Sequence, residues 1–446
     1  MRIIIAGAGE VGTHLAKMLS YEQHDIVVID TDEKKLSAID AHFDLLTING
    51  SATSFSVLNE ARVKNADLFV AATHREETNL MAAILSKKLG AKKTIARIDS
   101  SDYLLPKNID YFIKLGVDFV ICPEKLAANE IVGLLRQTGS SEIFEFSNGK
   151  LLLLVVKLDE NAPIINKTLV ETSNINKKFD YRAIAITRDS KTIIPRGHDK
   201  FQVNDLVFVL TNKDGVKNLL KYSGKQSFDI SNIMILGGSR IGYKTARDLE
   251  GHLNIKLIES DTELSHNLAE MLEKTLVVNS DISNINILKD EGLKDMDAFI
   301  AVTDNSETNI LACLYAKKNG VKKTIAEIEN IDYIDLAESI GIDTIINKKL
   351  ITASNIFRHT MKAKVECLKC LTGANAEVFE FVVQKRAKIT KKALKDIDFP
   401  KDAIIGGVVR GNDSFIAVGD TIIQDNDRVV VFSLPSAFKT VDNFFN

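Results

Sequence analysis

The chain opens with a short apolar run and a glycine-rich turn, and this stretch constrains the fold more than any other part of the sequence. Arg2 to Ala6 is rich in isoleucine and ends at a glycine, which predicts a buried parallel strand. Gly7, Gly9 and Gly12 have the G-x-G-x-x-G spacing that opens a helix, which we expect over His14–Leu19. In a dinucleotide site these glycines allow the tight turn, the close approach of a pyrophosphate and the packing of helix on strand, in that order.

An acidic residue stands where a dinucleotide motif requires one. Asp25–Asp30 predicts a second strand with a carboxylate at its end, and Asp30 lies 23 residues after Gly7. Such an acid accepts hydrogen bonds from an adenosine ribose and repels a 2′-phosphate, so NAD or another adenine nucleotide is favoured over NADP. The helix N-terminus and its dipole would favour the phosphates. The alternative is a glycine-rich turn in an unrelated α/β domain.

Length and charge limit the classes of function. The 446 residues should form two to four domains. A net charge of −3, from 57 basic and 60 acidic residues, gives no overall field that would recruit nucleic acid or anionic lipid. The longest obvious apolar run, Leu151 to Val156, is far shorter than the ~18 residues of a membrane helix. The chain begins directly in a strand, without room for a signal peptide, so we expect a soluble, cytoplasmic protein with no direct membrane insertion.

The four cysteines do not predict a disulfide scaffold. Cys122 and Cys313 stand beside apolar residues and are expected in the core. Cys367 and Cys370 form a C-x-x-C pair, but no second pair or suitably spaced histidine completes a zinc site. The pair is either a redox centre or, as we prefer, two neighbouring thiols.

An internal duplication dominates the organisation of the chain. Ile233 to Gly242 repeats the opening motif, with Gly237 at the place of Gly7, an offset of 230 residues. The same offset relates further segments of the two halves: Asp67–Thr73 to Asp297–Thr303, Glu77–Asn79 to Glu307–Asn309, Lys92–Ala96 to Lys322–Ala326, and Asp102–Tyr103 to Asp332–Tyr333.

Each copy reads as an open parallel α/β lobe followed by a smaller α+β module. In the first copy we expect strands near 45–48, 68–72, 94–98 and 117–121, a helix over 79–89, and, after Pro123, a helix over 124–136 stopped by Thr138-Gly139. Short strands follow near 142–146, 151–158, 183–187 and 206–210; Glu377–Phe381 echoes the first of these and Arg428–Phe432 the last. A cluster of Gly, Ser, Lys and Gln near 223–231 suggests the boundary between copies.

This organisation resembles the family of TrkA-type regulatory subunits of bacterial Trk potassium-uptake systems, which are built from two RCK (KTN) domains. The resemblance covers essentially the whole chain. It rests on Gly7–Gly12, Val28–Asp32, Thr73 with Glu77–Asn79, Ala96-Arg97, and their second-copy counterparts. It implies two tandem Rossmann-like lobes over residues 1–123 and 230–348. Each would be followed by a crossover helix and an α+β C-terminal lobe, over 124–225 and 349–446.

The resemblance also implies a function and two sites. The family binds NAD(H) and adenine nucleotides such as ATP and ADP. A ring of its lobes, here a homotetramer, docks on the cytoplasmic face of an integral-membrane potassium translocating subunit and gates it. Carried onto this sequence, the first site comprises Gly7, Ala8, Gly9, Glu10, Val11, Asp30, Ser51, Ala52, Ala72, Thr73 and Arg97. The second comprises Gly237, Gly238, Ser239, Arg240, Ile241, Glu259, Asp281 and Val302.

The second site departs from the family pattern. Ser239 replaces the middle glycine, and its Cβ can obstruct the approach of a phosphate. Glu259 replaces the ribose acid and remains able to accept hydrogen bonds from a ribose. Glu327 replaces Arg97 and would repel a phosphate, a repulsion that Arg240 in the glycine loop could offset. We expect weaker, altered or lost dinucleotide binding in the second half. Arg97 itself has an alternative interpretation as a surface salt bridge.

Two other classes of function compete with a ligand-sensing regulatory subunit. An NAD-dependent oxidoreductase needs a proton-transfer group beside the nicotinamide. Tyr103 and Lys107 have the Tyr-x-x-x-Lys spacing of short-chain dehydrogenases, but Pro106 should break the helix turn that aligns them. None of the eight histidines repeats between the copies, so we predict no enzyme. A scaffold with a vestigial fold is disfavoured by the intact motif of the first half.

Overall fold

The computed structural model describes the chain except residues 21–23, 42, 44, 136–141, 176–180, 190, 213–214, 217–218, 221–228, 282–285, 362 and 371–375. The helix stop expected at Thr138-Gly139 and most of the boundary expected near 223–231 therefore lie outside the described residues. The chain forms two compact units. One comprises Met1–Leu126 with Lys348–Met361, and the other Ala127–Asn347 with Lys362–Asn446.

The first lobe is a parallel sheet in the strand order β3-β2-β1-β4-β5-β6. This is the order of a Rossmann fold, in which ligands bind at the carboxyl edge where the order reverses, here between β1 and β4. Its central strands are apolar throughout because the parallel sheet is covered on both faces. The elements are β1 (Arg2–Ala6), α1 (Glu10–Ser20), β2 (Asp25–Asp30), α2 (Glu33–Asp40), β3 (Leu46–Asn49), α3 (Phe55–Glu60), β4 (Leu68–Ala71), α4 (Glu76–Leu89), β5 (Lys93–Arg97), α5 (Pro106–Leu115), β6 (Phe119–Ile121) and α6 (Pro123–Leu135).

Two helices of this lobe begin earlier than the sequence predicts. α1 begins at Glu10 rather than His14, because Gly12 lies inside the first helical turn on the buried stripe with Val11 and Leu15. α4 begins at Glu76 rather than Asn79, and two glutamates in its first turn favour the positive end of the helix dipole. The early start of α1 places Glu10 directly after the glycine turn.

The second lobe repeats the first, as the duplication predicts. Its sheet has the equivalent order β14-β13-β12-β15-β16-β17, and every pairing is parallel. Its elements are β12 (Asn232–Leu236), α9 (Arg240–Leu249), β13 (Asn254–Glu259), α10 (Thr262–Met271), β14 (Leu276–Asn279), α11 (Ile287–Asp290), β15 (Ala298–Ala301), α12 (Ser306–Lys318), β16 (Lys323–Glu327), α13 (Ile334–Ser339) and β17 (Thr344–Ile346).

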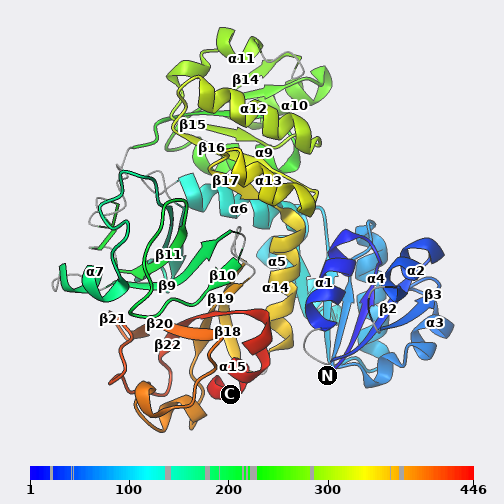
Figure 1. The fold of residues 1–446 in the computed structure, drawn as a ribbon. Coiled ribbons are helices and arrows are strands. Elements are labelled where there is room, and N and C mark those ends of the chain that lie inside the picture. The colour runs from blue at the N-terminus through cyan, green and yellow to red at the C-terminus, as the bar shows by residue number, and fades with distance from the viewer. Residues whose placement is uncertain are drawn as a thin grey trace. The chain divides into compact units, whose positions relative to one another are not determined.

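A helix of the second copy belongs to the first unit. α14 (Lys348–Phe357) continues the chain after β17, and it packs alongside α1 of the first lobe (Figure 1). The first unit is therefore built from both copies of the repeat. α1 therefore has residues of the second copy packed against it.

The two C-terminal lobes are antiparallel sheets that pack face to face within the second unit. Their orders are β10-β9-β11-β8-β7 and β18-β19-β22-β20-β21, and one apolar cluster, which includes Phe208 and Phe432, draws residues from both. Gly406 and Gly407 allow the close approach, since a Cβ at either would lie 2.9 or 2.8 Å from Leu210 Cδ2. The elements are β7 (Glu142–Phe146), β8 (Leu151–Lys157), α7 (Leu169–Ile175), β9 (Tyr181–Arg188), β10 (Lys191–Ile193), β11 (Leu206–Thr211), β18 (Lys364–Cys370), β19 (Glu377–Val382), β20 (Ala403–Arg410), β21 (Asp413–Ile416), β22 (Arg428–Ser433) and α15 (Phe438–Phe445).

One predicted equivalence between the C-terminal lobes is wrong. Glu377–Phe381 resembles Glu142–Phe146 in sequence, but the sheet orders place β19 at the position of β8, next to the central strand, and β18 at the position of β7. The other predicted equivalence, between Leu206–Leu210 and Arg428–Phe432, agrees with the sheet orders. The error arises because the likeness of two five-residue strands in sequence does not fix their positions in a sheet, which depend on packing against neighbouring strands.

Candidate functional site

Gly7 forms the tight turn between β1 and α1. Its φ of +115° is in a region that side chains disfavour, and a Cβ would lie 2.7 Å from the carbonyl oxygen of Ala72 at the end of β4. Its N–H donates to the carbonyl of Ile29 in β2 (2.8 Å). The turn is therefore fixed at the point where the strand order reverses, which is the ligand-binding edge of an open α/β sheet.

The other two motif glycines have different roles. A Cβ at Gly12 would overlap the carbonyl oxygen of Gly7, so this glycine is required for the helix to pack against the turn. A Cβ at Gly9 would meet nothing within 4 Å. The fold itself does not require a glycine at position 9, and the open space beside it is where a pyrophosphate would approach the backbone.

Asp30 ends β2 beside the glycine turn. Its carboxylate accepts from the N–H of Ala8 at 2.6 Å and from the N–H of Asp32 at 2.9 Å. The carbonyl oxygen of Asp30 accepts from the N–H of Gly50 (2.9 Å), which brings Ser51 and Ala52 next to it. Asp30 thus holds the glycine turn in place, besides lying where a ribose hydroxyl would be recognised.

The remaining residues of the expected first site also lie at this edge. Ala72 and Thr73 follow β4, Arg97 ends β5 and Glu10 opens α1. Val11 is an exception, because its side chain is buried in the face of α1 that packs on the sheet, and only its backbone can face a ligand.

A set of side-chain hydrogen bonds, which the sequence analysis did not predict, joins the ends of β4 and β5. The side chain of Asn79, which is 1% exposed, accepts from the N–H (2.9 Å) and Oγ1 (2.6 Å) of Thr73 and donates to the carbonyl oxygens of Thr73 and Arg97. Asn309 makes the same bonds to Thr303 and Glu327 in the second lobe. The asparagine of the repeated Glu-Thr-Asn segment therefore has the same structural role in both lobes, and the recurrence of the segment was the available signal.

Arg97 forms an ion pair in this structure. Its Nη2 lies 3.4 Å from Oδ1 of Asp99, as in the alternative interpretation of this residue, and its side chain is about one-fifth exposed. Its Nε is buried and has no hydrogen-bond partner among the described residues. The Arg97 guanidinium is thus held at the carboxyl edge of the sheet by an acid two residues further along the chain.

The second glycine turn has the same backbone but a different surface. Gly237 has a φ of +104°, and the Glu259 carboxylate accepts from the N–H of Gly238 (2.6 Å) and of Asp261 (2.8 Å). The hydroxyl of Ser239 accepts from the N–H of Gly242 at 3.3 Å and caps α9. A side chain of the protein thus takes the position at the helix N-terminus that a phosphate would need.

The longer side chain of Glu259 occupies space that is left free by the missing Cβ of Gly238. A Cβ at Gly238 would overlap Cδ1 of Leu268 and lie 2.9 Å from Oε2 of Glu259. The longer acid is 7% exposed and fits because the preceding turn has a glycine where the first lobe has Ala8. The carboxylate is therefore more enclosed than that of Asp30, which is only partly buried.

The other expected residues of the second site are distributed unevenly. Arg240 opens α9, while Ile241 and Val302 are buried in the core. Asp281 is exposed after β14. Glu327 ends β16 with a buried side chain, so this edge carries an acid where the first lobe has a guanidinium.

The arrangement that an oxidoreductase would need does not form at Tyr103. Tyr103 lies in a 3₁₀ turn (Ser101–Leu104), whereas Pro106 opens α5 and Lys107 is its second residue. The Tyr103 ring packs edge-on against Phe112, with 5.3 Å between centroids. No single helix therefore carries both Tyr103 and Lys107, because the helix begins at Pro106, as the proline predicts.

The potential metal ligands and thiols can be placed in the described parts of the chain. No group of three or more His, Cys, Asp or Glu side chains there could hold a metal ion. Cys122 and Cys313 are buried, as predicted, and burial raises the pKa of the Cys313 thiol. No helix among the described residues is long and apolar enough to cross a bilayer.

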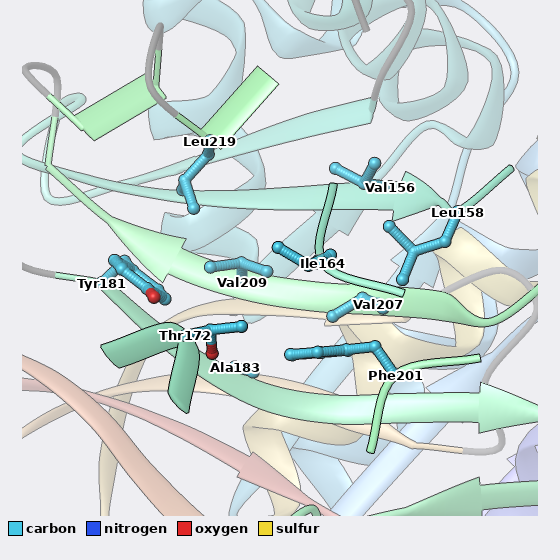
Figure 2. Close-up of a pocket in the computed structure, with 10 residues that line it drawn as sticks. All are labelled: Val156, Leu158, Ile164, Thr172, Tyr181, Ala183, Phe201, Val207, Val209 and Leu219. Atoms are coloured by element: carbon cyan, nitrogen blue, oxygen red, sulfur yellow. The ribbon is translucent and has the colours of Figure 1, made fainter. Parts of the chain in front are cut away.

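A hollow in the first C-terminal lobe is unsuited to a phosphate. Figure 2 shows its lining, which comes from β8, β9, β11 and the segments that cover them and carries no charged side chain. The lining residues are Val156, Leu158, Ile164, Thr172, Tyr181, Ala183, Phe201, Val207, Val209 and Leu219. The equivalent place in the second C-terminal lobe is filled, because Phe381 takes the position of Val156 and stacks on Phe445 of α15 at 4.4 Å.

Filling this hollow should stabilise the protein. Replacing Val156 by phenylalanine is expected to raise the free energy of unfolding by about 1 kcal/mol, the usual gain from filling a cavity. The matched change Phe381→Val should lower it by about 2 kcal/mol. Thermal denaturation with hydrogen exchange of β8 and β19 measures both, and a destabilised Val156→Phe protein would mean that the hollow cannot accept a ring.

The geometry defines a class of protein: two tandem Rossmann-like lobes, each paired with a small α+β lobe and each with a glycine turn at the switch point. The TrkA-N domain model matches residues 3–123 and 233–348, and the TrkA-C domain model matches residues 153–224 and 378–446. The chain belongs to the TrkA family. This confirms the resemblance found from the sequence.

Relatives and solved structures agree with this assignment. The chain is 33% identical to the Trk system potassium uptake protein TrkA homolog 1 of Methanosarcina mazei and to the TrkA homolog of Archaeoglobus fulgidus, over the full length of each chain. It is also 33% identical to the TrkA of Vibrio alginolyticus, over 97% of this chain and 95% of that one. Among solved structures, the GsuK RCK domain superposes with a TM-score of 0.60 at 17% identity, covering 100% of this chain and 94% of that one. The fold is thus that of tandem RCK domains.

Proposed function

We propose that this protein is a cytoplasmic, nucleotide-sensing regulatory subunit that gates a membrane-embedded potassium transporter. The observation that carries the proposal is the first glycine turn, where Gly9 leaves open space, α1 presents its N-terminus and Asp30 stands beside both. Helix N-termini of this kind bind phosphates, and an acid in this position binds an adenosine ribose. Family membership supports the role in potassium uptake.

The proposed ligand is NAD(H), ATP or ADP, bound in the first lobe. Ser51, Ala52, Ala72 and Thr73 would line the adenosine side, and the partly exposed guanidinium of Arg97 would reach a phosphate or ribose oxygen. A GsuK channel with the same fold has been solved bound to NAD, and another GsuK structure bound to ADP. In the second lobe Ser239 and Glu327 oppose a phosphate, so binding there would be weaker or lost.

Gating would follow from differential affinity. A ligand that binds one conformation of the lobes better shifts the population toward it, and couplings of ~1–3 kcal/mol bias a partner by about 5–150-fold. The proposed assembly is a homotetramer docked peripherally on the inner face of a Trk-type translocating subunit. The protein would act by binding rather than by catalysis.

Calorimetric titration of ATP, ADP, NAD and NADH into the wild type, Asp30→Ala and Glu259→Ala tests the site. We expect one tight site that Asp30→Ala weakens roughly 10- to 100-fold, through the loss of charged hydrogen bonds to the ribose. Glu259→Ala should leave that site unchanged. Thermal denaturation of each variant controls for loss of the glycine turn, and a wild type that binds none of these nucleotides would contradict the proposal.

A further inference from the structure

A lysine from the second copy lies at the glycine turn of the first. Lys349 is the second residue of α14, and its Nζ forms an ion pair with Oε2 of Glu10. Glu10 is the first residue of α1 and directly follows Gly9. The Lys349 side chain is 6% exposed and that of Glu10 is 70% exposed, so the lysine is the buried partner. An ammonium group is therefore held at the helix N-terminus where phosphates would bind.

The helix that carries Lys349 is also fixed at its far end. The ring of His359, just after α14, packs against Phe119 of β6 with 4.0 Å between centroids. Burial, with smaller contributions from Arg358 and Lys93, lowers the pKa of His359 to about 4, so this contact is uncharged at pH 7. Because α14 is anchored along α1 and at β6, the position of Lys349 is set by the fold of the first unit.

The charges at this turn have a consequence for an anionic ligand. The Glu10 carboxylate at the start of α1 interacts well with the helix dipole but repels a phosphate at the same end. Lys349 neutralises Glu10, and an ammonium group can donate to a phosphate oxygen in a charge-assisted hydrogen bond. The turn without Lys349 would carry an uncompensated negative charge.

The crossover helix of the second copy carries this cation, and the equivalent helix of the first copy does not. At the position on α6 that is equivalent to Lys349, the first copy has Glu124, which has the same sign of charge as Glu10. The second glycine turn carries Arg240 at the position of Glu10, so it already has a positive charge of its own. The signs are thus reversed between the copies, and α14 is the crossover helix whose charge suits the first turn.

We propose that Lys349 is a phosphate-binding residue of the first site, so that a site on the first copy is completed by the second. The ligand class is an adenine nucleotide with a diphosphate, and the inference rests on the function proposed above. An entering phosphate takes Lys349 as a partner in place of Glu10, which changes the contact between α1 and α14. Ligand binding in the first lobe is thereby sensed by a helix that continues into the second copy's C-terminal lobe.

The test compares ADP with adenosine, measured by competition against a fluorescent ADP, for the wild type and four variants. Lys349→Met should weaken ADP roughly 10- to 100-fold and adenosine less than about threefold, because only ADP carries the phosphates. The double variant Glu10→Gln/Lys349→Met should stay weak for ADP. Lys349→Arg should keep the preference for ADP. Lys348→Met, which removes an equal charge from the adjacent residue, should match the wild type.

The outcomes separate this inference from the proposed function. If the wild type binds neither ligand, the nucleotide site is wrong and the inference falls with it. If the wild type prefers ADP and the double variant keeps that preference, Lys349 only neutralises Glu10 and the inference alone is overturned. Equal weakening of ADP and adenosine would show a structural role only. Should Lys349→Met fail to fold, the double variant, which leaves no unpaired charge, gives the decisive ratio.

Discussion

Replacing Gly12 by alanine is expected to destabilise the first lobe by about 3 kcal/mol, whereas Gly9→Ala should leave its stability within about 1 kcal/mol of the wild type. A Cβ at Gly12 overlaps the carbonyl oxygen of Gly7, which is rigid backbone, so the turn or α1 must move. A Cβ at Gly9 meets nothing within 4 Å. Alanine should thus lower the stability of the lobe strongly at Gly12 and only slightly at Gly9.

The same two variants separate fold from function. If the pyrophosphate lies beside Gly9, alanine there obstructs it, and Gly9→Ala should lose most nucleotide affinity while melting at nearly the wild-type temperature. Gly12→Ala should lose affinity only because its lobe is damaged. Differential scanning calorimetry and nucleotide titration of each protein give the four values needed.

Gly242→Ala provides the matched control in the second lobe. A Cβ at Gly242 overlaps the carbonyl oxygen of Gly237 just as at Gly12. It should destabilise its own lobe to a similar extent and leave the first nucleotide site intact. Full nucleotide affinity in Gly9→Ala would contradict the placement of the phosphates, and a stable Gly12→Ala would contradict the packing.

The sequence predicted the lobes better than the modules that follow them. Parallel strands in a Rossmann lobe are buried on both faces, so they appear in the sequence as apolar runs. The glycines that follow them and the acid at Asp30, which ends β2, can also be recognised in the sequence. Helix starts were less visible. The start of α1 at Glu10 depends on Gly12 being tolerated in a helical turn because it packs against Gly7, which is a tertiary effect.

What the sequence could not show is which copy completes which site. The ion pair between Glu10 and Lys349 joins residues far apart in the chain, and it exists because α14 crosses into the first unit. The reversed charges at Glu124 and Arg240 were present in the sequence, but they acquire meaning only when the crossover is known. The wrong equivalence in the C-terminal lobes has a related cause. Sequence likeness matches β19 to β7, whereas the sheet orders, which the sequence does not show, match it to β8.

A repeated signal in the C-terminal lobes was available and was missed. Gln202-Val-Asn-Asp205 and Gln424-Asp-Asn-Asp427 recur at an offset of 222 residues, not 230. Each carboxylate accepts from the backbone N–H of its own glutamine, at 2.8 and 2.7 Å. The asparagine of each segment has a positive φ, which is +68° at Asn204 and +67° at Asn426. The motif is a turn that places a buried aspartate directly before the central strand of each sheet, β11 or β22.

Removing that aspartate should have a large effect on stability. Asp205 is fully buried and accepts from Nε and Nη2 of Arg188 at 2.7 and 2.8 Å; its hydrogen bonds raise the pKa of the Arg188 guanidinium. Asp205→Ala removes the carboxylate that pairs with this guanidinium, which keeps only the carbonyl oxygen of Lys200 among the described residues, and it removes the acceptor of the Gln202 N–H. We expect a loss of about 3 kcal/mol, at the lower end for a broken buried pair because Arg188 is partly exposed.

The damage should be greatest in the C-terminal lobe that carries the substitution, which hydrogen exchange can show. Amides of β9 and β11 should exchange faster in Asp205→Ala, whereas those of β20 and β22 should do so in Asp427→Ala, because Arg410 holds Asp427 in the same way at 2.9 and 2.7 Å. The shared apolar cluster between the two sheets would transmit part of each effect to the other lobe. Asp205→Asn keeps an acceptor for Gln202 and should cost less than alanine. Exchange that is unchanged in both variants would mean that neither the ion pair nor the aspartate's bond to the turn holds the strands together.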